Sequence, residues 1–166
     1  TAIRAMLAAL QARRDAKAQR DRAALRLLYD LGLRRGEVVA LDVADVDLTA
    51  GRVAVLGKGR RQPDVLALPE PTQAALRAWL TVRGGHPGPV FTNFDRARKG
   101  SGRLTGTSLY RIVRTLGAQV GFTVRPHGLR HTAITEACKA AQAHGIALEE
   151  VLDFSRHRDV KVLMIY

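Results

Sequence analysis

The sequence predicts a mainly α-helical domain that also carries a small three-stranded antiparallel β-sheet, an α+β fold. Apolar residues recur at the spacing of one helical face over much of the chain, most clearly across 107–120. Three short segments rich in Val and Leu, at 43–48, 52–56 and 64–68, instead have the length and the flanking turn residues of strands. A chain of 166 residues, 46% of them hydrophobic, is long enough for one well-packed domain.

The helices are expected in a definite order along the chain. The first contains Ile3 to Leu10, and the second begins after Gln19 and ends at Gly32, which can adopt a left-handed conformation. A short helix from Arg35 to Leu41 then precedes the strands. Pro71 opens the next helix, residues 84–104 form a loop, and further helices are expected at 107–120, 127–143, 147–154 and 159–166.

The charge of the chain indicates a polyanionic partner. Lys and Arg total 27 against 15 Asp and Glu, a formal charge of +12 at pH 7. Cationic side chains that neutralise phosphates release condensed counterions, and this release drives binding to nucleic acids. The basic residues of the loop at 84–104 indicate either a solvated loop or one that contacts phosphates; they are Arg96, Arg98, Lys99 and Arg103.

Other features of the composition bear on the compartment. The single cysteine, Cys138, lies in a helical apolar pattern, where we expect a core residue, and it excludes an internal disulfide, as suits a reducing cytosol. No apolar run approaches the roughly 20 residues that span a bilayer, and Arg4, Arg13 and Arg14 interrupt any signal-peptide pattern. We therefore expect a cytoplasmic, nucleoid-associated protein with no membrane partner.

Four motifs stand in a fixed order along the chain. Gly32-Leu33-Arg34 begins where the second helix ends, and Gly57-Lys58-Gly59 separates two strands. Pro126-His127-Gly128-Leu129-Arg130-His131-Thr132 lies far downstream, and His157 precedes Tyr166 by nine positions. This succession resembles the tyrosine recombinases of the phage integrase family over nearly the whole chain. The resemblance implies the catalytic-domain fold of that family and the catalytic set Arg34, Lys58, His127, Arg130, His157 and Tyr166, with Glu37 in support.

The implied reaction is site-specific DNA cleavage and rejoining by transesterification through a 3′-phosphotyrosyl intermediate on Tyr166. The two arginines, Arg34 and Arg130, suit the charge that grows on the non-bridging phosphate oxygens. An unperturbed phenol has a pKa near 10 and needs a base, for which His127 is the candidate. Lys58 could protonate the leaving 5′ oxygen, and His157 could donate a hydrogen bond to phosphate. The covalent intermediate conserves bond energy, so we expect no cofactor. We also expect no metal, because the arginines provide the positive charge.

The resemblance has implications beyond these residues. Family members act as tetramers on paired sites of double-stranded DNA, and they carry an N-terminal DNA-clamping domain and a C-terminal tail. Residues 1–166 are therefore expected to be a catalytic-domain fragment without either part. The sequence departs from the family pattern at Ser155-Arg156, where Leu-Gly is usual.

Other interpretations remain open. A type IB topoisomerase shares the Arg, Lys, Arg, His, Tyr set, and a non-catalytic DNA-binding module would carry the same positive charge. An RNA-binding domain is less favoured, because aromatic residues make up only 5% of the chain. Tyr29 and Tyr110 compete with Tyr166 as nucleophiles, but both lie in predicted helices, and we expect them to be structural.

Overall fold

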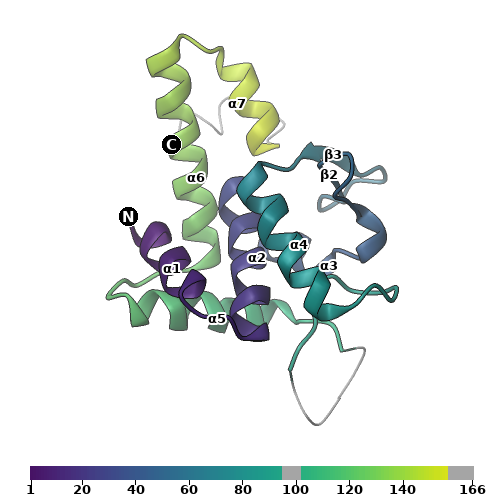
Figure 1. Ribbon diagram of the computed structural model, residues 1–166. Helices are drawn as coiled ribbons and strands as arrows, with labels where there is room; N and C mark the ends of the chain where they lie inside the picture. Colours follow the sequence, from purple (N-terminus) through teal and green to yellow (C-terminus); the bar gives the residue numbers. More distant parts are fainter. Residues whose placement is uncertain (95–101, 157–166) are drawn as a thin grey trace.

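The computed structural model describes residues 1–94 and 102–156 (Figure 1). The predicted helix at 159–166, the site residues His157 and Tyr166, and the loop residues Arg96, Arg98 and Lys99 lie outside the described residues. The described elements are α1 (Ala2–Gln11), α2 (Ala16–Asp30), α3 (Arg35–Ala40), a 3-10 turn (Val43–Asp45), β1 (Val46–Asp47), β2 (Arg52–Val55), β3 (Asp64–Ala67), α4 (Glu70–Arg83), α5 (Gly106–Gln119), α6 (Pro126–His144) and α7 (Leu148–Ser155). The predicted α+β class is confirmed.

Helix α2 occupies the centre of the fold. It packs against α1, α4 and α6, and Figure 1 shows α5 crossing beneath these helices. The main core collects their apolar faces together with buried residues from the sheet and from the segment before α5. Trp79 of α4 and Phe91 are among its largest fully buried side chains, and the Trp79 indole N–H donates to the Val90 carbonyl at 2.8 Å. No described helix is long and apolar enough to cross a membrane.

The sheet has the order β1-β2-β3, with both neighbouring pairs antiparallel. The strand predicted at 43–48 is wrong over its first half, because Val43–Asp45 forms a 3-10 turn and β1 keeps only Val46 and Asp47. The Asp42 N–H donates to a carboxylate oxygen of Asp45 at 2.8 Å, which closes this turn. A local side-chain hydrogen bond therefore competes successfully with strand pairing here.

The start of α2 also differs from the prediction. The helix begins at Ala16, before Gln19, because the Asp15 carboxylate accepts a hydrogen bond from the Ala18 N–H at 3.0 Å and caps the helix. The end of α2 was predicted correctly: Gly32 has a φ of 59° just after the last helical residues.

Helices α6 and α7 form a second, smaller apolar cluster. Ile134, Cys138 and Ala141 of α6 pack with Val151 of α7, which confirms Cys138 as a core residue. Figure 1 shows α6 extending beyond the helical body, with α7 returning from its end towards the sheet. The end of α7 therefore lies next to Glu37 of α3 and Arg130 of α6.

Candidate active site

The loop that joins α2 to α3 presents Arg34. Leu33 is fully buried and anchors the loop, while Arg34 stands immediately before α3. The Glu37 carboxylate accepts hydrogen bonds from the Arg34 N–H at 2.7 Å and from the Arg34 guanidinium at 3.2 Å. This capping arrangement fixes both the backbone and the side chain of Arg34.

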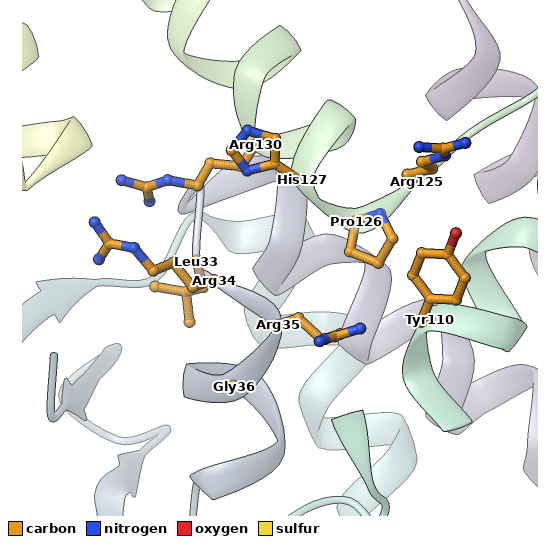
Figure 2. Close-up of a pocket in the computed structure, with 9 residues that line it drawn as sticks. All are labelled: Leu33, Arg34, Arg35, Gly36, Tyr110, Arg125, Pro126, His127 and Arg130. Carbon is orange, nitrogen blue, oxygen red and sulfur yellow. The ribbon is translucent and has the colours of Figure 1, made fainter. Parts of the chain in front are cut away.

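Arg130 reaches the same loop from α6. Its side chain is buried, with the residue 4% exposed, and its guanidinium donates to the Gly32 carbonyl and, at 2.6 Å, to the Ser155 carbonyl. Gly32 lies two residues before Arg34, so this contact places the two arginines on one loop-helix junction. In Figure 2 the side chains of Arg34 and Arg130 extend towards the same side.

These residues line a pocket of about 440 Å³. Its walls are Leu33, Arg34, Arg35, Gly36, Tyr110, Arg125, Pro126, His127 and Arg130. Four of these residues are arginines, and among the described residues no Asp or Glu lines the pocket. His127 stands one helical turn before Arg130 on α6, as Figure 2 shows. The pocket is therefore suited to an anion.

Glu37 lies just behind this pocket as a buried carboxylate. Burial alone would raise its pKa, but the hydrogen bond from the Arg34 N–H and the positive charges of Arg156 and Arg34 outweigh burial. The pKa of Glu37 is consequently held below its usual value, and the group is ionised at neutral pH. It neutralises part of the arginine charge without reaching the pocket.

Lys58 does not line the pocket. It is exposed at the turn between β2 and β3, where the Arg60 N–H donates to the Gly57 carbonyl at 3.1 Å and Gly59 has a φ of 72°. The structure thus confirms Lys58 at a hairpin tip with a flanking glycine in a left-handed conformation. Of the predicted set, Arg34, His127 and Arg130 meet at the pocket.

Three pocket residues were missed by sequence reasoning. Tyr110 of α5 was expected to be structural, yet it lines the pocket, and the Arg35 guanidinium lies 5.8 Å from its ring centroid. Arg35 and Arg125 were not predicted as site residues, although each lies directly beside a motif residue, and this adjacency could have indicated them. The interpretation of Arg103 as a phosphate contact is not favoured, because its guanidinium binds Asp42 and the Val39 carbonyl at the end of α3.

Comparisons with known proteins find tyrosine recombinases among the relatives of this chain. A tyrosine recombinase of Synechocystis sp. is 38% identical over 154 residues, covering 90% of this chain and 48% of the relative. The tyrosine recombinase XerC of Azotobacter vinelandii is 36% identical, covering 92% of this chain and 49% of the relative. The chain thus spans about half the length of the curated relatives that it matches.

Solved structures support the same fold. The crystal structure of XerA recombinase superposes with a TM-score of 0.79 at 24% identity, covering 99% of this chain and 55% of that one. XerH site-specific recombinase bound to difH substrate gives a TM-score of 0.74 at 23% identity, covering 99% of this chain and 47% of that one. The profile of the phage integrase family matches residues 1–166. With its fold and its two converging arginine motifs, the chain belongs to the phage integrase family.

Proposed function

We propose that this chain is the catalytic domain of a site-specific DNA recombinase, which cleaves and rejoins DNA through a 3′-phosphotyrosyl link to Tyr166. The observation that carries the proposal is the pocket in which Arg34, Arg130 and His127 meet with no acidic side chain in the described lining. Such a pocket suits a single phosphodiester that gains negative charge during reaction. Family membership supports the same chemistry.

Charge stabilisation is assigned to the two arginines. The attack of a tyrosine oxygen on phosphorus gives a transition state with more charge on the non-bridging oxygens than the ground state has. Arginine stays protonated and offers planar, paired donors to those oxygens. A single arginine supplied to phosphoryl transfer contributes about 10³–10⁵ in rate. Arg34 is held by Glu37, and Arg130 by two backbone carbonyls, so little reorganisation is needed when the phosphate binds.

The remaining steps are proton transfers. Tyr166 loses its phenolic proton as it attacks, and the imidazole of His127, exposed at the pocket, is the proposed acceptor. The 5′ oxygen departs and takes a proton from Lys58, which the hairpin would carry to the DNA. His157 donates a hydrogen bond to a phosphate oxygen. Rejoining reverses these steps when a second 5′ hydroxyl attacks the phosphotyrosyl link, so neither ATP nor a metal enters the balance.

The proposed partner is double-stranded DNA, with the complete protein acting as a tetramer on paired sites and associated with the nucleoid. Two similar structures are described as XerH bound to its difH substrate before and after cleavage, which supports DNA as the partner. The charge of +12 supports binding to phosphates generally. We propose that the complete protein also has an N-terminal DNA-clamping domain and a C-terminal tail.

A nicked suicide substrate tests the proposal. The nick releases a short strand after cleavage, so the covalent complex accumulates and migrates as a separate band in denaturing gels. The complete natural protein should form this adduct, Tyr166→Phe should form none, and Arg34→Ala should form it much more slowly. Arg77→Ala, an exposed position on α4, serves as the control.

Two results would redirect the assignment. A gel shift without adduct for the wild type would indicate a non-catalytic DNA-binding module. Relaxation of supercoiled plasmid without a defined target site would indicate a type IB topoisomerase.

A further inference from the structure

Arg156 ends α7 in an unusual backbone conformation. Its φ of 54° and ψ of 31° place it in the left-handed region, and it is the only non-glycine residue with positive φ within 1–94 and 102–156. Glycine adopts this conformation without a steric penalty, whereas a residue with a Cβ seldom does. The arginine side chain is nevertheless buried, only 4% exposed. The backbone conformation at this position favours glycine, so the presence of an arginine must be explained by the contacts of its side chain.

Those contacts connect three parts of the fold. The Arg156 guanidinium donates to the Glu37 carboxylate, and its second terminal nitrogen lies 3.7 Å from an Asp64 carboxylate oxygen at the start of β3. Asp64 in turn accepts a hydrogen bond from Arg60 at 2.6 Å, beside the turn that carries Lys58. Glu37 is the same carboxylate that holds Arg34.

The residue before Arg156 contacts the other pocket arginine. The Ser155 carbonyl accepts a hydrogen bond from the Arg130 guanidinium at 2.6 Å. Two consecutive residues at the end of α7 thus bind both halves of the arginine pair: Ser155 binds Arg130 directly, and Arg156 binds Arg34 through Glu37. His157, the next residue in the chain, belongs to the proposed catalytic set.

We propose that Arg156 is a positioning residue of the active site, which keeps the Glu37 carboxylate in place and so fixes the Arg34 guanidinium relative to Arg130. This inference rests on the proposed function only for its effect on cleavage. Arg156 is buried behind the pocket and does not line it, so it acts through Glu37 and not by touching DNA.

A buried carboxylate depends strongly on its cations. Glu37 faces Arg34 just before its own helix and Arg156 at the end of α7. On the β3 side, Asp64 lies against Arg156 and is itself paired with Arg60. Removal of Arg156 leaves Glu37 buried with Arg34 as its remaining cation, so desolvation favours its protonated form. A protonated Glu37 would hold the Arg34 guanidinium more weakly. Arg34 would then lose its fixed geometry as pH falls.

The test uses the complete natural protein with Arg156→Met, which removes the charge but keeps most of the volume. Arg20→Met is the matched control, because Arg20 is also a buried arginine paired with an acid, Asp21, at 2.7 Å, and it does not line the pocket. Both variants are assayed below their melting temperatures. The readouts are the single-turnover cleavage rate of saturating nicked DNA against pH, the DNA dissociation constant, and the Glu37 carboxyl pKa from carbon-13 NMR.

Arg156→Met should cleave about 10²-fold more slowly, the loss that a displacement of about 1 Å can cause. Its DNA affinity should be unchanged, the pKa of Glu37 should rise, and the acid limb of its rate profile should move to higher pH. In a Glu37→Gln background the same substitution should cause little further loss. Arg156→Lys, which restores a cation, should recover part of the rate; it also serves if Arg156→Met does not fold.

Several results would overturn the inference. The first is a Glu37 pKa that does not change in Arg156→Met, and the second is a dependence of cleavage rate on pH that is the same in the Met and Lys variants as in the wild type. The third is a loss of cleavage rate that adds fully to that of Glu37→Gln, and the fourth is the same shift of the rate profile in Arg20→Met. The NMR readout needs no cleavage. A wild type that forms no adduct, together with a raised Glu37 pKa in Arg156→Met, would therefore refute the proposed function while supporting the role of Arg156.

Discussion

Arg130→Lys separates the structural and catalytic roles of the buried arginine. Lysine keeps the positive charge but replaces a planar fork with a single ammonium group. The Arg130 fork bridges the carbonyl of Gly32, after α2, and that of Ser155, at the end of α7. The lysine side chain is shorter, and its single ammonium group cannot donate to the Gly32 and Ser155 carbonyls at the same time, as the arginine fork does. At least one buried hydrogen bond is therefore lost.

The magnitude follows from that loss. A hydrogen bond to a charged group contributes about 1.5–3 kcal/mol, and we expect the free energy of unfolding to fall by about this amount. Adduct formation should slow by about 10²–10³-fold, the usual loss on removing one preorganised donor from a developing oxyanion. Stability is measured by urea denaturation followed by circular dichroism, and cleavage with the nicked substrate.

The control for this prediction is Arg77→Lys, an exposed arginine on α4 outside the pocket lining. It should change neither measurement appreciably. If Arg130→Lys were as stable as Arg77→Lys, the two carbonyl contacts would not hold the junction as described. If it lost stability but cleaved at the wild-type rate, Arg130 would have no part in the chemistry.

Three further predictions concern other parts of the fold. Arg35→Gln should weaken binding to all DNA sequences and reduce the salt dependence of the binding constant by about one counterion. Filter binding at several salt concentrations measures this dependence, and an unchanged dependence would show that Arg35 does not contact DNA phosphates. Gly117→Ala should lower the free energy of unfolding by about 1–3 kcal/mol, because a Cβ there would lie 2.8 Å from the Phe122 carbonyl oxygen. At Gly128 an added Cβ meets nothing within 4 Å, so Gly128→Ala should leave stability unchanged or raise it. Equal melting temperatures for these two alanine variants would contradict the packing. Burial and the hydrogen bond to Glu136 raise the pKa of Tyr29 to about 12, so the unfolded chain releases this proton first and stability should fall as pH rises from about 10 towards 12; a Tyr29→Phe variant with the same alkaline slope would refute this.

Local patterns predicted most of the elements. The apolar spacing that predicted a helix over 107–120 gave a helix at Gly106–Gln119, because one apolar stripe faces the core. The errors arose where a side chain bonds to the backbone nearby. Asp15 extends α2 at its start, and Asp45 turns a predicted strand into a 3-10 turn. Such short-range competition is invisible to hydrophobic periodicity.

The candidate site was predictable only in part. Motif order identified Arg34 and Arg130, but their meeting depends on a contact between residues 98 positions apart, which no spacing rule specifies. The sequence shows Arg156 as a departure from the family pattern. Arginine side chains are usually exposed, so the sequence did not predict that Arg156 is buried against Glu37. Tyr110 was expected to be structural because it lies in an amphipathic helix, but such a helix also carries residues at the margin of its buried face, and Tyr110 lines the pocket there.

Peptide mass spectrometry of the trapped protein-DNA adduct tests the central claim most directly. After protease and nuclease digestion, the residual nucleotide marks the side chain that attacked phosphorus. The chain offers three tyrosines, and the nucleotide should be found on Tyr166 alone. A nucleotide on Tyr29 or Tyr110, or an adduct that persists unchanged in Tyr166→Phe, would contradict the account.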